Sequence, residues 1–114
     1  MTVNIEAWRK VFKQVVSGLA NEGSQRRGWF GIGPEQSSPG EEFNMFFNDV
    51  AAKALLARKD NGFTEPQQCA AQELYNLMRK LSDETPDNIF PEDLIDDPRW
   101  IEVRLAAARL LALL

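Results

Sequence analysis

The sequence predicts an all-α protein, a small four-helix bundle-like domain formed by residues 1–114. Apolar residues recur at intervals of three and four over long stretches, which is the period of one helix face. Capping sequences that contain a proline follow Ser38 and Thr64. No alternating run of useful length indicates a strand. With 44% hydrophobic and 26% charged residues, the chain has the composition of one globular domain with a packed core.

The first predicted helix is capped by Asn4 and ends at Gly23. Its apolar face consists of Ile5, Trp8, Phe12, Val15, Val16 and Leu19. We expect a long loop over residues 23–40, between the first and second helices, because this stretch is rich in glycine and contains proline. A connection of this length permits an irregular crossing of the two helices.

The second predicted helix begins at Ser38-Pro39-Gly40-Glu41 and is closed by Gly62. Its apolar face consists of Phe43, Phe46, Phe47, Val50, Ala54 and Ala57. The third helix begins at once, after Thr64, so these two helices are expected to be antiparallel neighbours. We interpret Cys69 as a small buried residue beside the core positions Ala70, Leu74, Leu77, Met78 and Leu81.

An acidic loop, residues 82–97, precedes the fourth helix; it contains Pro86 and Pro91 and is followed directly by Pro98, and one helical turn is expected over 91–96. We expect Phe90, Leu94 and Ile95 to hold this loop on the body of the protein. The last helix starts at Asp97-Pro98 and is apolar around most of its circumference, so it is either central or shared with a second molecule. We expect a homodimer with its contact near Leu110, Leu111 and Leu114.

Charge is unevenly distributed along a chain whose net charge is −4. Before residue 40 the basic residues are Arg9, Lys10, Lys13, Arg26 and Arg27, and they outnumber the acids there. Between residues 83 and 97 the sequence has no lysine or arginine, and the acids are Asp83, Glu84, Asp87, Glu92, Asp93, Asp96 and Asp97. This asymmetry can steer a charged partner, although a solvated acidic loop that keeps the domain soluble is the simpler interpretation.

The absence of histidine removes the commonest general base and the commonest zinc ligand. The single cysteine permits no disulfide within the chain. We interpret Glu41 and Glu42, in a first helical turn, as residues placed there by the helix dipole. We therefore expect no enzyme activity, no metal and no cofactor. The chain has no export signal and no apolar run long enough to cross a bilayer, so we expect a cytoplasmic protein without membrane contact.

The candidate binding residues lie in the predicted 23–40 loop. Arg26, Arg27, Trp29 and Phe30 combine planar charge with large rings, and these residue types concentrate binding energy at interfaces. In the alternative interpretation, Trp29, Phe30 and Ile32 fold back as a lid on the bundle and leave the arginines solvated, because exposure of so much aromatic surface is unfavourable.

Two function classes fit these observations. The first is a small acidic non-catalytic protein-binding module, such as an inhibitor, an immunity-type protein or an accessory or regulatory factor, whose acidic segment meets a basic protein partner. The alternative is a ligand or nucleic-acid binding protein that uses the same four loop residues and the basic face of the first helix. The overall acidity of the chain favours the first class.

Overall fold

The protein is all-helical. The structure, a computed structural model, describes residues 4–32, 36–86 and 89–114, and within these ranges it contains no strand. Its elements are α1 (Ile5–Ala20), α2 (Glu22–Trp29), α3 (Pro39–Asn44), the π-helix η1 (Met45–Asp49), α4 (Ala52–Ala57), α5 (Glu65–Glu84), α6 (Pro91–Leu94) and α7 (Pro98–Leu113). The all-α class that the sequence predicts is confirmed. In the described part of the chain, no helix is sufficiently long and apolar to span a bilayer.

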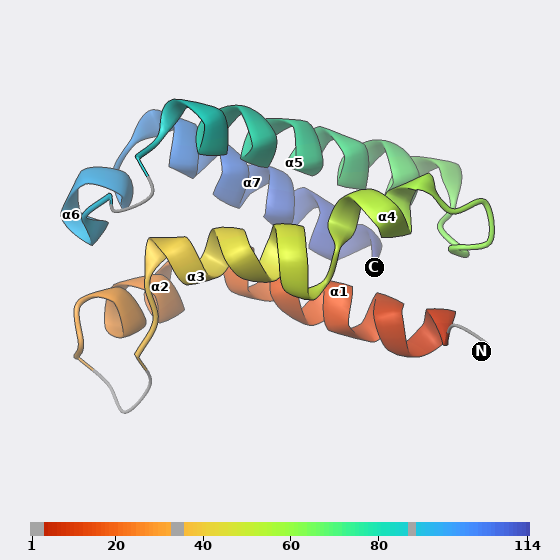
Figure 1. Cartoon of the computed structure of the whole chain (residues 1–114), viewed down its shortest axis with the longest axis horizontal. Coiled ribbons are helices and arrows are strands. Elements are labelled where there is room, and N and C mark those ends of the chain that lie inside the picture. The colour runs from red at the N-terminus through yellow and green to blue at the C-terminus, as the bar shows by residue number, and fades with distance from the viewer. Residues whose placement is uncertain (1–3, 33–35, 87–88) are drawn as a thin grey trace.

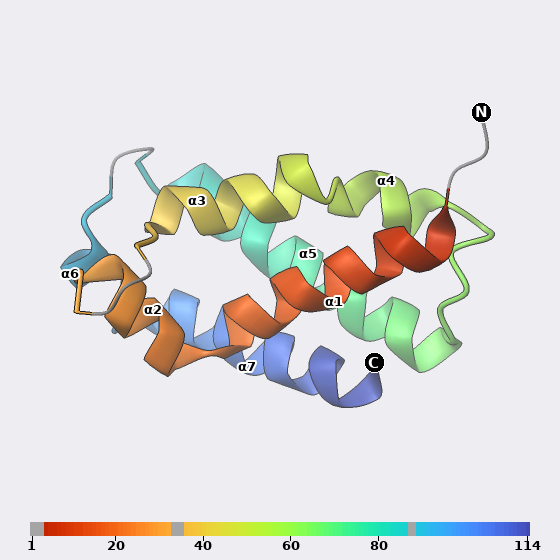
Figure 2. The ribbon, with the colours of Figure 1, turned by 90° about the horizontal axis from the view of Figure 1, so that it is seen from below.

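The C-terminal helix α7 is central, because it packs on both α1 and α5 (Figures 1 and 2). Its buried residues are Trp100, Val103, Ala106, Ala107 and Leu110. The placement of Leu110 at a dimer contact was therefore wrong, since this side chain is fully buried within one chain. Leu105 and Leu113 remain exposed on the same helix, and the homodimer itself stays a prediction.

The long 23–40 loop was predicted wrongly in its first part, because residues 22–29 form the helix α2. Helix α1 ends at Ala20 and not at Gly23. Asn21 separates the two helices in an extended conformation, and its side-chain oxygen accepts a hydrogen bond from the backbone N–H of Ser24 at 3.0 Å. An asparagine cap therefore starts a new helix where glycine was expected to end the old one. Gly33, Pro34 and Glu35 lie outside the described residues.

The second predicted helix is interrupted. It starts as predicted at Ser38, whose hydroxyl accepts a hydrogen bond from the backbone N–H of Glu41 at 3.2 Å. The helix then widens into η1, and Ala51 adopts a left-handed conformation with φ 47° and ψ 58°. The indole N–H of Trp8 donates a 2.6 Å hydrogen bond to the carbonyl of Val50 and holds α1 against this break. The chain then resumes as a separate helix, α4.

Helix α5 begins at the predicted capping box. The hydroxyl of Thr64 accepts from the N–H of Gln67 at 3.3 Å, and the Gln67 side chain accepts from the N–H of Thr64 at 2.8 Å. Leu74, Met78 and Leu81 are buried as expected, together with Ala71. Cys69, however, is exposed, which corrects its assignment as a buried residue, because it lies on the opposite side of the helix from this face.

The acidic connection contains the expected helical turn as α6, which lies at the same end of the molecule as α2 (Figure 1). Leu94 and Ile95 are buried and hold the turn on the core. Phe90 does not, because 63% of its surface is exposed. The carboxylate of Asp97 caps α7 by accepting from the N–H of Arg99 at 2.8 Å. Asp87 lies outside the described residues.

Candidate functional site

The four candidate binding residues do not form one surface. Trp29 is only 7% exposed, and its ring centroid lies 5.4 Å from that of Trp100. Arg27 faces solvent at the end of α2, and Phe30, directly after this helix, is 40% exposed. The ring of Trp29 therefore lies where the lid interpretation expected it, whereas Arg27 and Phe30 remain accessible.

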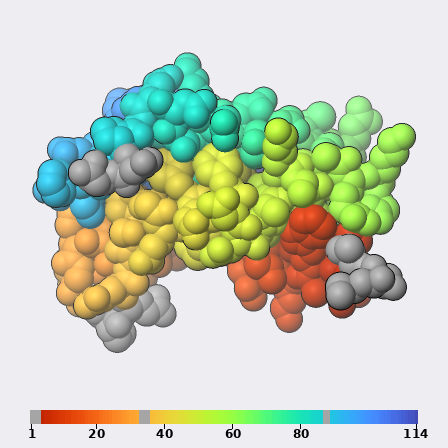
Figure 3. Space-filling model, in the orientation of Figure 1, coloured from red at the N-terminus to blue at the C-terminus, as the bar shows by residue number. Residues whose placement is uncertain are grey.

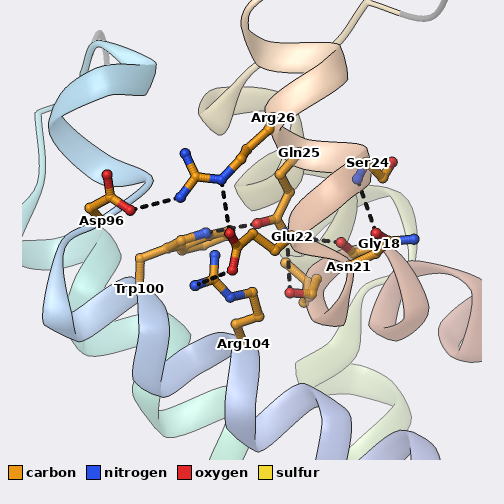
Figure 4. A network of polar contacts seen from close by, with 10 residues as sticks. Gly18, Asn21, Glu22, Ser24, Gln25, Arg26, Asp96, Trp100 and Arg104 are labelled. Atoms are coloured by element: carbon orange, nitrogen blue, oxygen red, sulfur yellow. Dashed lines mark hydrogen bonds and ion pairs between the residues drawn. The ribbon is translucent and has the colours of Figure 1, made fainter. Parts of the chain in front are cut away.

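Arg26 is paired with carboxylates from two parts of the chain (Figure 4). Its guanidinium donates 2.8 Å hydrogen bonds to Glu22 and to Asp96, which lies between α6 and α7. These bonds, first that to Glu22, raise the pKa of Arg26, and the bond with Arg26 is the main reason why the pKa of Glu22 is lowered. Arg104 adds a second cation at 3.0 Å from Glu22. An anionic ligand of Arg26 would therefore compete with two internal partners.

Gln25 fixes the position of α2, and it is a buried residue that the sequence analysis missed. Its amide nitrogen donates 2.9 Å hydrogen bonds to the carbonyls of Gly18 and Leu19 at the end of α1. Its amide oxygen accepts a 3.0 Å bond from the indole N–H of Trp100 (Figure 4). Both ends of the amide are thus satisfied, as a buried polar side chain requires. This network holds α2 against α1 and α7.

A groove of about 650 Å³ lies between α1, α2 and the α3–η1 segment, and we name it the α1–α3 groove. One wall is formed by Val11, Gln14, Val15 and Gly18 of α1 and by Ser24 and Gly28 of α2. The other wall is formed by Gln36, Ser37, Glu41, Glu42, Met45 and Asp49. Figure 3 shows the hollow beneath α3, between the α2 surface in orange and the α1 surface in red. A volume of this size is typical of ligand sites.

Glycines shape the groove at two positions. At Gly28, a Cβ atom would come within 2.3 Å of the hydroxyl oxygen of Ser37, so only glycine permits the close approach of α2 to the chain before α3. The N–H of Ser37 donates a 3.1 Å hydrogen bond to the carbonyl of Gly28 at this contact. At Gly18, a Cβ atom would lie 3.8 Å from Oε2 of Glu42, an ordinary contact distance. The absence of a side chain at Gly18 therefore leaves space beside the Glu42 carboxyl.

Glu42 is the buried carboxyl of this groove. Only 6% of the residue is exposed, and Oε2 is shut off from solvent without a hydrogen-bond partner in the described chain. Burial, and then the charge of Glu41, raises the pKa of Glu42 to about 7. The helix-dipole interpretation of Glu42 was therefore incomplete, because a favourable dipole alone would lower the pKa of this carboxyl. A buried polar atom without a partner requires a functional or structural explanation.

The wall that carries Glu42 continues into the π-helix. Met45 and Asp49, the first and last residues of η1, both line the α1–α3 groove. The wide turn is closed by the N–H of Val50, which donates to the carbonyl of Met45 at 2.9 Å. Short π-helical turns inside α-helices are frequent at functional sites. The π-helical turn η1 and the buried carboxyl of Glu42 thus lie on the same wall of the α1–α3 groove.

The groove is acidic. Glu41, Glu42 and Asp49 are charged or titratable groups on its wall, and its described lining residues include no lysine or arginine. The acids of the 82–97 segment differ, because several are paired: Arg99 lies 2.8 Å from Asp97 and 3.0 Å from Glu84. The hydrogen bond from Arg99 is also the main reason why the pKa of Asp97 is lowered. Within residues 4–32, 36–86 and 89–114, no metal-binding group of three or more acidic or cysteine side chains assembles.

The sequence did contain a signal for Glu42. Pro39 and Phe46 are buried on one face of α3 and η1, and Glu42 follows the first by three positions and precedes the second by four. A carboxylate at this spacing falls on the buried side of a helix. The groove itself could not be predicted, because it depends on the unforeseen helix α2.

Comparison with known proteins gave no match to any family model, curated protein or solved structure. Its fold and the geometry of its site define the molecule as an all-helical protein with an acidic surface groove.

Proposed function

We propose that the protein is a non-catalytic binding module that takes a basic, partly apolar segment of another protein into the α1–α3 groove. The observation that carries this proposal is the charge of the groove: Glu41, Glu42 and Asp49 line it, and no cation is among its described lining residues. Complementary charge attracts a partner and selects against partners of the wrong sign.

The composition of the walls supports a peptide segment as the occupant. Val11, Val15 and Met45 provide apolar surface, and Val11 is 44% exposed although it is aliphatic. Gln14, Ser24 and Ser37 provide hydrogen-bonding groups between these apolar residues. Pockets with this mixture bind by apolar contact and use a few polar groups to fix orientation.

The nucleic-acid alternative has less support. Arg26 is already paired with Glu22 and Asp96, and Trp29 is packed on Trp100. Nucleic-acid sites combine free cations with exposed rings on which bases stack. Of the four candidate residues, Trp29 is buried and Arg26 is held in two ion pairs, which leaves Arg27 and Phe30 exposed.

The test uses four pools of nine-residue peptides with lysine, arginine, norleucine or glutamate fixed at the centre and apolar or neutral residues elsewhere. We expect the two basic pools to bind at pH 8 and the glutamate pool not to bind. Amide chemical shifts should change at Val15, Gly18 and Met45. Binding should fall at least tenfold in Gly18→Leu, whose side chain would occupy the groove, while circular dichroism shows an intact helical fold.

Two results would contradict the proposal. In the first, basic and acidic pools bind equally, or none binds. In the second, Gly18→Leu retains full affinity although it fills the groove. Lys53→Leu is the matched control, because it adds the same side chain at an exposed position of α4 that does not line the groove. This control should bind the basic pools like the unmodified protein.

A further inference from the structure

We propose that the α1–α3 groove recognises a single lysine side chain of its partner and that the carboxylate of Glu42 receives the ammonium group. This inference rests on the proposed function, and it adds which side chain enters the groove and which residue selects it.

Glu42 is unsatisfied in the free protein. A carboxyl that is 6% exposed and has an enclosed Oε2 without a partner is an unfavourable feature in a free protein. In the free protein, glutamine at position 42 would avoid the free-energy cost of holding a negative charge in this buried position. Because Oε2 is enclosed, an ammonium delivered by the partner would meet the carboxylate on its other oxygen, and its charge would offset the cost of ionising Glu42 only in the complex, so the residue fits a binding role better than a structural one.

The walls of the α1–α3 groove suit a lysine side chain. Lysine carries its charge on four methylene groups, which favour apolar surroundings while the ammonium seeks polar ones. Val11, Val15 and Met45 offer aliphatic surface for the stem. The side-chain oxygens of Ser24 and Ser37, on the same walls, are acceptors of the type that remaining N–H groups of an ammonium need.

The geometry of the groove favours lysine over arginine. A guanidinium binds best when it reaches both oxygens of a carboxylate or stacks on an aromatic ring. Oε2 of Glu42 is enclosed, so a two-point contact would require the wall to open. The described lining residues include no aromatic ring. An ammonium, which is a compact point charge, requires neither feature.

Recognition of this kind is linked to pH. Burial and the neighbouring Glu41 raise the pKa of Glu42 to about 7, so the carboxyl is protonated in much of the free protein near neutrality and must release its proton to receive an ammonium. The other titratable group on the groove wall is Asp49 of η1. The lining residues of α1 and α2, which face Glu42, are all uncharged.

The experiment measures the dissociation constants of the lysine, arginine and norleucine pools at pH 8 and pH 5.5. We expect the lysine pool to bind at least tenfold more tightly than the other two at pH 8. Because the carboxyl must be ionised, affinity for the lysine pool should fall about 30-fold at pH 5.5, the ratio set by a pKa near 7. Lysine itself remains charged across this range.

Two variants with the same change in charge separate Glu42 from the general acidity of the groove. Glu42→Gln should abolish the preference for lysine over norleucine and remove the dependence on pH. Glu41→Gln, one residue away on an exposed position of α3, should weaken the binding of both basic pools by a similar small factor and preserve the preference for lysine. Circular dichroism of both variants at both pH values confirms that each remains folded.

The outcomes distinguish this inference from the proposed function. If the basic pools bind and Gly18→Leu blocks them, but Glu42→Gln retains the preference for lysine, the role of Glu42 is refuted and the binding function stands. A stronger response to arginine than to lysine also refutes this inference alone. If no pool binds at either pH, both proposals fail.

Discussion

Gln25 and Trp100 are joined by a buried hydrogen bond although 75 positions separate them in the sequence. The indole N–H donates to the side-chain oxygen at 3.0 Å, and the same glutamine donates to the end of α1. Trp100 is also in contact with the ring of Trp29. One amide therefore positions α2, and with it the α2 wall of the α1–α3 groove.

Replacing Gln25 with leucine should destabilise the protein by about 3 kcal/mol. The change removes the acceptor of a buried indole N–H and the donor to two carbonyls, and an unsatisfied buried group costs roughly 1–3 kcal/mol. Urea denaturation followed by circular dichroism measures the loss. Gln72→Leu is the control, since Gln72 is exposed on α5, and its effect should stay within about 0.5 kcal/mol. Equal effects of the two changes would show that the Gln25 network is unimportant.

Glu42→Gln should stabilise the protein at pH 8 and have little effect near pH 4. The folded-state pKa of Glu42 is raised to about 7 from a model-compound value of 4.5, so the folded state holds the proton more tightly than the unfolded state. This contribution is full below pH 4.5 and is lost as the pH rises to about 7. The shift in the pKa of Glu42 corresponds to about 3 kcal/mol of unfolding free energy, which the unmodified protein loses over this pH range.

Thermal and urea unfolding at pH 4, 6 and 8 test this linkage. The difference in unfolding free energy between Glu42→Gln and the unmodified protein should grow with pH and level off above pH 7. Glu41→Gln, which changes the same charge on an exposed residue, should give a much flatter difference. A constant difference for Glu42→Gln over this range would mean that Glu42 does not titrate near neutrality.

Trp29→Ala should destabilise the protein by about 3 kcal/mol, because it removes a large buried ring from its contact with Trp100. Phe30→Ala, at the next position, should cost less than about 1 kcal/mol because this ring is 40% exposed. Calorimetric melting temperatures compare the two. If Trp29→Ala left the melting temperature intact and removed partner binding, the ring would be a binding anchor, as the sequence analysis first expected.

Gly28→Ala should destabilise the protein by about 2 kcal/mol, since the new methyl group would meet the Ser37 hydroxyl at 2.3 Å. The double variant Gly28→Ala/Ser37→Ala should recover most of this loss, because the nearest remaining atoms of residue 37 lie at 3.4 Å. Unfolding free energies of both single variants and the double variant give the coupling. Additive effects would show that residues 28 and 37 do not meet.

The helices that begin with local capping sequences could be predicted from the sequence. Ser38, Thr64 and Asp97 form caps with the backbone of the next few residues, so no distant contact is needed to recognise them. Helix α2 also has a local cap, at Asn21, but this cap was not enough to predict the helix. Its sequence contains two glycines and a serine, which are poor helix formers, and contacts of Gln25 and Trp29 with α7 outweigh that preference.

The candidate site was harder to predict for the same reason. Arg26 and Trp29 were selected by residue type, but their roles depend on Asp96 and Trp100, which are distant in the sequence. Glu42 was interpreted as a carboxylate in a first turn, although its spacing from Pro39 and Phe46 already placed it on the buried face of the helix. Its burial is decided by α1, which leaves an unfilled space at Gly18 beside the carboxyl.

The left-handed conformation of Ala51 allows the apolar residues of 39–57 to pack on two different helices, α1 and α5. In an unbroken helix, the phase of the side chains is fixed from end to end, so Phe46 and Leu55 could not be turned independently. The wide π turn and the reversal at Ala51 reset that phase, and η1 then packs on α1 while α4 packs on α5. Residues 39–57 therefore form two helical segments whose packing faces are set independently of each other. Deleting one residue within η1 should restore a regular helix and rotate one of the two packing faces toward water.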